Sequence, residues 1–219
     1  MRLAGLLVMA TLTLVACGSD ADRQFPTVAH APPQAAAPIT AIPQPAYQPG
    51  QRWTYSDGYD LKVVSVTDGL ARIERQDLSD TWYVKRAFFV EESQGSEGNR
   101  RTVFWSQDPM KVFQLRPGEA MVTEQEYLRN GELVRHVVSW TLEGRQRLRV
   151  PAGEFDAWVF VSRARNLKTG WTAYEKHWYA PDVGNFIRTE HRYGNDEDGA
   201  RVLMASGVEP VKKKWSLTP

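Results

Sequence analysis

From residue 47 onward, turn-forming residues recur at short intervals, and this spacing constrains the fold more than any other feature of the sequence. The turn signals lie at 56–58, 67–69, 130–131, 143–144, 168–170 and 194–196. Between them lie runs that alternate apolar and polar residues, as half-buried β-strands do. No stretch of helical length keeps apolar residues three and four positions apart between capping residues. We therefore predict an all-β, antiparallel domain over residues 48–219, with at most one short helical turn between Gln107 and Phe113.

One turn signal is specific enough to predict the type of turn that joins two strands. Asn130-Gly131 separates two alternating runs, and this pair favours a type I′ turn because both positions need φ > 0. The run that follows, residues 132–143, alternates cleanly. Its apolar face carries Val134, His136, Val138, Trp140 and Leu142. We predict a β-hairpin here, with a second strand that buries one face.

Two runs, at 150–158 and 177–188, organise the C-terminal third of the chain. Pro151 forces the residue before it to be extended and Gly153 supplies φ > 0, so Pro151-Ala152-Gly153 predicts a tight corner. Three antiparallel strands in sequence are then expected at 155–161, 171–179 and 186–193, joined by a turn at 168–170 and a second corner at 181–184. This arrangement is a meander.

The same two runs carry a family resemblance. VPAGEF-x-AW at 150–158 and WYAPDVG-x-FIR at 178–188 resemble the uncharacterised periplasmic β-proteins grouped around the DUF3108 and TapB-like domains. The resemblance implies a periplasmic β domain, and it carries no catalytic motif.

The predicted domain is large enough to bury a core without disulfides. We expect a strongly curved antiparallel sheet or incomplete β-barrel, broadly similar to the LolA and LolB lipoprotein carriers. A closed lipocalin-like barrel and a two-sheet sandwich remain open alternatives, because the number of strands does not separate them.

The N-terminus predicts a membrane anchor. Residues 3–15 form an uncharged apolar run after Met1-Arg2. The run is shorter than the ~20 residues of a membrane span and fits a signal peptide over residues 1–16. It ends in Leu14-Val15-Ala16-Cys17, which resembles the lipobox of bacterial lipoproteins and implies cleavage before Cys17 and lipidation of its thiol. An ordinary secretory signal is the alternative, although this lone cysteine has no partner for a disulfide.

The residues after the cysteine suggest a location and a tether. Gly18 stands where an Asp would resemble an inner-membrane retention signal, so the same resemblance implies the outer membrane, with the domain facing the periplasm. Residues 17–47 are rich in proline and alanine and show no strand or helix period. Such a composition buries too little apolar surface to offset the entropy of ordering, so we expect a disordered linker.

Signatures of catalysis are missing: there is no nucleophile elbow, no zinc-protease motif and no phosphate-binding glycine loop. Glu175 and His177 share a strand face, and Glu190 lies on the next strand, so these three define the alternative of an envelope hydrolase or metal-dependent enzyme. We expect instead that they occupy a solvated outer face of the meander, opposite Tyr174 and Trp178. No cofactor and no metal site is predicted.

The eight tryptophans lie in or beside predicted strands, and most of them are expected to fill the core. Trp140, Trp158 and His136 are the candidate ligand-binding residues, because they lie at an apolar strand face or directly after the corner. The balance of 27 basic and 26 acidic residues gives no positive field for nucleic acid.

We therefore expect a lipid-anchored, non-enzymatic envelope protein. Its concave β surface would bind a hydrophobic ligand or another envelope protein. A purely structural subunit of an envelope assembly is a further alternative, in which case the surface would carry no cleft.

Overall fold

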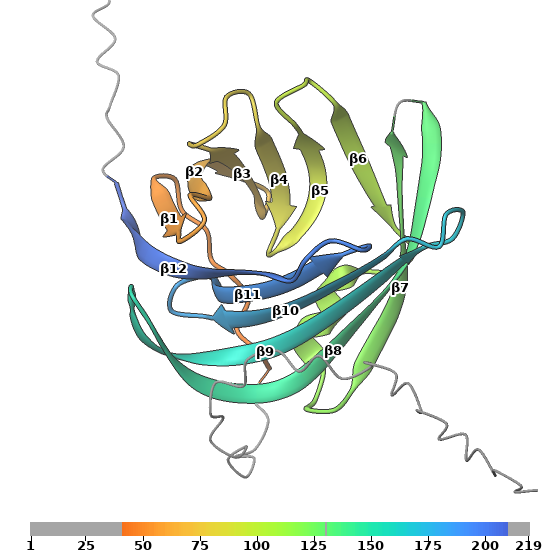
Figure 1. The fold of residues 1–219 in the computed structure, drawn as a ribbon. Coiled ribbons are helices and arrows are strands. Elements are labelled where there is room, and N and C mark those ends of the chain that lie inside the picture. Colours follow the sequence, from red (N-terminus) through yellow and green to blue (C-terminus); the bar gives the residue numbers. More distant parts are fainter. Residues whose placement is uncertain (1–40, 130, 210–219) are drawn as a thin grey trace, which may run out of the picture. The chain divides into compact units, whose positions relative to one another are not determined.

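The computed structural model describes residues 41–129 and 131–209 (Figure 1). The described residues form twelve β-strands and one 3-10 helix. They are β1 (Gln51–Tyr55), β2 (Asp60–Thr67), β3 (Leu70–Arg75), β4 (Trp82–Arg86), β5 (Phe89–Gln94), β6 (Arg100–Trp105), η1 (Pro109–Gln114), β7 (Ala120–Arg129), β8 (Glu132–Val150), β9 (Gly153–Asn166), β10 (Thr172–Ala180), β11 (Asn185–Tyr193) and β12 (Gly199–Val208). The expected helical turn is η1.

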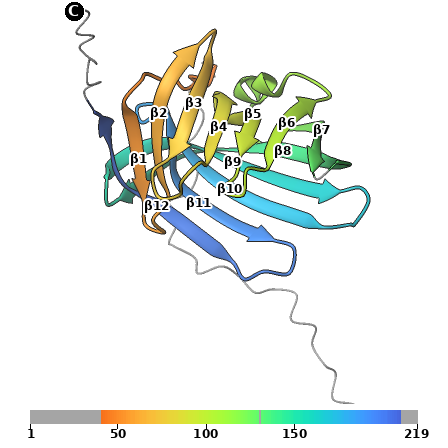
Figure 2. The same ribbon diagram turned by 90° about the horizontal axis from the view of Figure 1, so that it is seen from above.

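Each strand pairs antiparallel with its neighbours in sequence, and β12 pairs with β1 to close the sheet into a barrel (Figures 1 and 2). At this seam Gln51 lies opposite Val208 and Trp53 lies opposite Ser206. The predicted all-β antiparallel fold is thus confirmed. Of the architectures left open by the sequence, the structure has the closed barrel.

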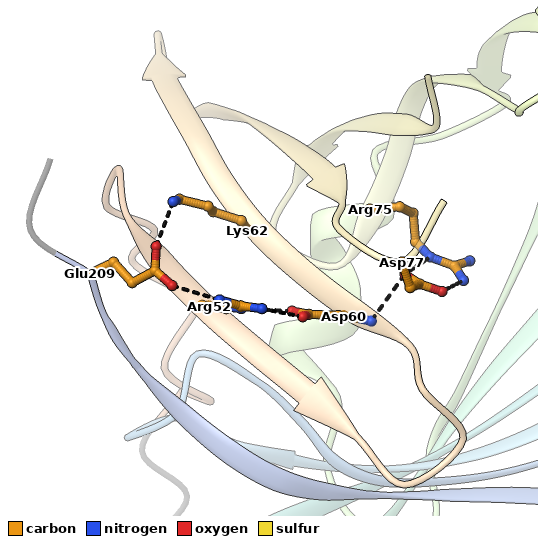
Figure 3. Close-up of polar contacts among 6 residues, drawn as sticks. All are labelled: Arg52, Asp60, Lys62, Arg75, Asp77 and Glu209. Carbon is orange, nitrogen blue, oxygen red and sulfur yellow. Dashed lines mark hydrogen bonds and ion pairs between the residues drawn. The ribbon is translucent and has the colours of Figure 1, made fainter. Parts of the chain in front are cut away.

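A network of polar contacts among six charged residues runs from the seam between the first and last strands, across β2, to the end of β3 (Figure 3). Its members are Arg52, Asp60, Lys62, Arg75, Asp77 and Glu209. The Glu209 carboxylate accepts from Arg52 Nη1 at 2.6 Å and from Lys62 Nζ at 2.5 Å, while Arg52 Nε donates to Asp60 at 2.9 Å. These contacts tie the residue after β12 to β1 and β2.

The predicted turns are present, with one exception. Arg129 pairs with Glu132 across the Asn130-Gly131 hairpin, and Val150 pairs with Gly153 across the Pro151-Ala152 corner. Gly153 has φ of 143° and Gly184, at the second corner, has φ of 69°, values that favour glycine. The turn predicted at 143–144 is wrong. β8 runs through it with a bulge between Leu142 and Gly144, because residues on both sides pair with β9.

Buried side chains form two clusters. One joins β1, β2 and β3 to β9, β10, β11 and β12, and includes Trp53, Ile73 and Trp178. The other joins η1 and the β4–β5 turn to β7, β8, β9 and β10. The Phe88 ring, in the two-residue β4–β5 turn, lies 4.7 Å from Phe89 and 4.9 Å from Phe113 between ring centroids.

The folded domain begins earlier than residue 48, which is the boundary predicted between the linker and the β domain. Residues 41–47 belong to the expected linker 17–47, but they pack against the barrel. Ile42 is only 3% exposed, and its amide donates to the Phe113 carbonyl at 3.1 Å. Tyr47 OH donates to the Ala87 carbonyl at 2.7 Å, and Tyr179 OH donates to Pro43 at 2.9 Å. The apolar side chain of Ile42 and these hydrogen bonds offset the entropy of ordering.

The signal peptide predicted at 1–16, the lipidation site Cys17 and linker residues 17–40 lie outside the described residues. The described part of the chain contains no helix with the length and apolarity needed to cross a membrane.

Candidate functional site

A cavity of about 400 Å³ lies inside the barrel, lined by residues from every strand except β3. This volume falls within the range of roughly 300–1,000 Å³ that is typical of small-ligand sites. Its wall is part aromatic, with Phe88, Phe89, Trp105, Trp140 and Phe186, and part polar. The small side chains of Ala164 and Ala173 also line it.

The polar wall follows from the register of the C-terminal strands. Residues directly opposite each other on paired strands project to the same face of the sheet. One transverse row runs through Trp140, Ser162, Glu175, His191 and Gly199, and the adjacent row runs through Leu142, Phe160, His177, Thr189 and Arg201. The meander therefore brings Glu175, His177 and His191 together inside the barrel.

Glu175 is the carboxylate of this wall. Tyr193 OH donates to its Oε1 at 2.5 Å, Ser162 Oγ donates to its Oε2 at 3.3 Å, and His177 Nε2 lies 3.4 Å from the same oxygen. Burial alone would raise the pKa of Glu175, but the nearby His177 and the two hydroxyl donors outweigh it and lower the pKa to about 2. The Glu175 oxygens are thus already committed to donors from the protein.

His177 is held rigidly. Its ring stacks against Phe186 at 4.3 Å and against Trp140 at 5.6 Å, with interplanar angles of 19° in both cases. Its Nδ1 lies 3.3 Å from Thr189 Oγ1. His191 packs over Gly199, where an added Cβ would lie 2.4 Å from His191 Nε2. Only glycine leaves room for this imidazole.

Several nitrogen atoms of the wall have no partner. Among the described residues, four buried side-chain nitrogens have no hydrogen-bond partner: Trp105 Nε1, Trp140 Nε1, His191 Nδ1 and Arg201 Nε. A fifth, His177 Nε2, has only its 3.4 Å contact with Glu175 Oε2. All of these residues line the cavity. Tryptophan and arginine nitrogens can only donate. A buried donor without an acceptor costs ~1–3 kcal/mol, so this concentration at one cavity calls for an explanation.

Two cationic side chains complete the cavity. Lys85 projects from β4, with its Nζ 5.2 Å from the centre of the Tyr83 ring. Burial lowers the pKa of Lys85 to about 8, with Glu175 opposing this effect and Arg201 adding to it. Arg201 pairs with Asp57 at 3.0 Å and lies over the Tyr59 ring at 4.2 Å, which leaves its Nε unpaired.

The three predicted ligand-binding residues have different positions. Trp140 lines the cavity. Trp158 packs against the second buried cluster, half-buried under the Arg145 guanidinium at 5.1 Å. His136 is buried beside Tyr127, its Nε2 3.4 Å from Asn166 Nδ2, and burial lowers its pKa. Neither His136 nor Trp158 lines the cavity.

The expectation that Glu175, His177 and Glu190 share a solvated outer face is wrong. Glu175 and His177 line the cavity, whereas Glu190 lies on the opposite face and accepts from Arg188 Nε at 3.1 Å. Alternation along a strand tells which residues share a face, but not which face is inside. The residue that joins Glu175 and His177 is His191. In the described residues, no three His, Cys, Asp or Glu side chains are grouped closely enough to hold a metal ion.

The sequence matches no model of a known protein family and no curated protein. Similar folds occur among solved structures. The hypothetical lipoprotein YmcC from Escherichia coli K12 is 11% identical with a TM-score of 0.50, over 77% of this chain and 90% of YmcC. At this identity the likeness concerns the fold alone, and the chain shares the β fold of YmcC.

Two further structures align less well. One is from Parabacteroides distasonis and is described provisionally as a lipoprotein; it is 14% identical with a TM-score of 0.38, over 76% of this chain and 97% of that one. The other, from Bacteroides fragilis, is described provisionally as exported, with a YmcC-like fold; it is 14% identical with a TM-score of 0.40, over 76% of this chain and 98% of that one.

Proposed function

We propose that this protein is a lipid-anchored component of the bacterial cell envelope that binds a small ligand inside its β-barrel and catalyses no reaction. One observation carries the binding function. The four buried nitrogens without a protein partner, on Trp105, Trp140, His191 and Arg201, all belong to the wall of a single cavity. A ligand that supplies acceptors would remove the cost of burying them.

The envelope location rests on the N-terminal sequence. Leu14-Val15-Ala16-Cys17 supports lipidation at Cys17, and Gly18 supports the outer membrane, with the barrel in the periplasm. The likeness of the fold to YmcC, a hypothetical lipoprotein, agrees with this location. Several acyl chains on one cysteine would make the anchor effectively permanent, because each buried CH₂ contributes ~0.8 kcal/mol.

Binding is favoured over catalysis by the state of Glu175. An acid–base enzyme could use the Glu175–His177 pair, whose side chains do converge in the cavity. However, a carboxylate whose pKa is lowered to about 2 is a weak general base at neutral pH, since efficient proton transfer requires a pKa near the working pH. The hydrogen bonds to Glu175 are therefore best explained as structural.

The test uses the full chain with Cys17→Ser, purified without detergent, and the neutral apolar dye N-phenyl-1-naphthylamine. We expect the dye to fluoresce on binding and the signal to be weakened in Ala164→Phe, because this side chain would occupy part of the cavity. Ala200→Phe is the control, since Ala200 is exposed and pairs with outer-face Glu190. Absence of dye binding, or equal binding by all three proteins, would refute a ligand site in the barrel.

A further inference from the structure

We infer that the ligand of the barrel cavity is an amphipathic organic acid, whose carboxylate lies between Lys85 and Arg201 and whose apolar part lies against the phenylalanine-rich wall. This inference rests on the binding function proposed above and names the chemical class of the ligand.

The first argument is that the free hydrogen-bonding capacity of the wall is biased toward donors. Trp105, Trp140 and Arg201 each hold a buried N–H that has no acceptor in the protein. The carboxylate of the wall, Glu175, has both oxygens engaged by Tyr193 and Ser162. A cationic ligand would therefore find no free carboxylate, whereas an anion would find several free donors.

The second argument concerns charge. No ion pair among the described residues includes Lys85. The groups that face it are Tyr83 on its own strand, Tyr59 after β1, Glu175 on β10 and Arg201 on β12. Arg201 keeps its Nε free although Asp57 pairs with the other end of its guanidinium. An anion between Lys85 and Arg201 would relieve the repulsion between the two cations.

The third argument separates an organic acid from an inorganic anion. Phe88, Phe89 and Phe186 offer the cavity apolar ring surface. A small inorganic anion would leave this surface uncovered and would lose its own hydration there without compensation. A molecule with one carboxylate and an apolar chain matches both halves of the wall.

The experiment measures displacement of N-phenyl-1-naphthylamine from the full Cys17→Ser chain by decanoate, by decanol and by inorganic phosphate. Decanoate and decanol share the same chain length and differ in the acid group. We expect decanoate to displace the dye at least about tenfold better than decanol, since hydrogen bonds to charged groups are the strong ones. Phosphate should not displace it.

Two variants assign the preference to Lys85. Lys85→Met should abolish the tenfold difference, and Lys85→Arg should retain it. Lys62→Met is the matched control, because Lys62 pairs with Glu209 at the seam and does not line the cavity. The preference for decanoate should also fall as pH rises from about 7 to about 10, because Lys85 loses its charge while decanoate keeps its own.

If decanoate and decanol displace the dye equally well from the protein without cavity substitutions, the inference is overturned. The proposed binding function would still stand in that case, because the dye binds. This comparison needs no variant, so it holds even if Lys85→Met fails to fold. Displacement by phosphate as efficient as by decanoate would overturn the organic-acid class. Failure of the dye to bind at all would overturn the proposed function itself.

Discussion

Replacement of Glu175 by Gln should destabilise the protein by an amount that depends on pH. Burial raises the pKa of this half-buried carboxyl, but His177, Tyr193 and Ser162 outweigh it and lower the pKa from 4.5 to about 2. Each unit between the folded and unfolded pKa is worth ~1.4 kcal/mol, so ionised Glu175 contributes at most about 3–4 kcal/mol at neutral pH. About 30% of its side chain is accessible, which makes this figure an upper limit.

The sign of the pH dependence follows from linkage. A carboxyl whose folded pKa is lowered stabilises the fold above its unfolded pKa, here 4.5, and loses that contribution as pH falls toward 2. The difference in unfolding free energy between the wild type and Glu175→Gln should therefore be largest near neutral pH. It should shrink steadily below about pH 4.5, as the wild-type carboxyl takes up its proton.

Urea unfolding of both proteins between about pH 7 and about pH 3 measures this difference directly. Glu132→Gln is the matched control, because the Glu132 side chain at the start of β8 is largely exposed and pairs only with exposed Lys168. Its effect should stay below about 1 kcal/mol across the range. A Glu175→Gln effect that is equally small, or that does not change with pH, would refute the assignment of Glu175 as a buried, ionised group.

Three further predictions concern the anchor, the packed N-terminal segment and the corners. Cys17→Ser should abolish metabolic labelling with palmitate, and labelling that persists would exclude this cysteine as the lipidation site. Ile42→Ala should lower the unfolding free energy by about 2–5 kcal/mol, since a side chain only 3% exposed leaves a cavity; urea denaturation with no change would mean that Ile42 does not pack. Gly153→Val and Gly184→Val should each cost at least about 1–3 kcal/mol in the same assay, because φ of 143° and 69° disfavours β-branched residues. Gly95→Val is the control at a position with open space, and equal effects at all three glycines would contradict the strain argument.

The strands and corners could be predicted because their signals are local. Pro151-Ala152-Gly153 determines the backbone over three residues, and Val150 pairs with Gly153 across it. Arg129 pairs with Glu132 on either side of the turn predicted at 130–131. Closure of the barrel could not be predicted in this way. It depends on the pairing of β1 with β12, at opposite ends of the domain, and nothing in either strand marks the other as its partner.

The site was harder to predict because both faces of the meander look alike. On β10, Tyr174 and Trp178 alternate with Glu175 and His177, and this pattern favours the aromatic pair as the inner face. In the barrel Glu175 and His177 line the cavity, while Trp178 does not line it and packs into the first buried cluster with Trp53 and Ile73. Both faces of this part of β10 are therefore buried, so apolarity alone does not identify the face that lines the cavity.

The remaining site residues come from distant strands. Lys85 on β4, Trp105 on β6 and Arg201 on β12 meet Glu175 only because the sheet closes. Composition also misled the interpretation of residues 41–47. Their prolines indicate disorder, whereas Ile42 and Tyr47 supply enough contacts to order them.

The most direct test of the account is native mass spectrometry of the protein released gently from the membranes of the cells that make it. We expect the wild-type protein to carry a bound small molecule, seen as added mass that is lost on denaturation. Ala164→Phe should carry less of it, because its side chain occupies part of the cavity, whereas Ala200→Phe should match the wild type. If the wild type and Ala164→Phe carry the same added mass, or if neither carries any, the barrel interior is not a ligand site.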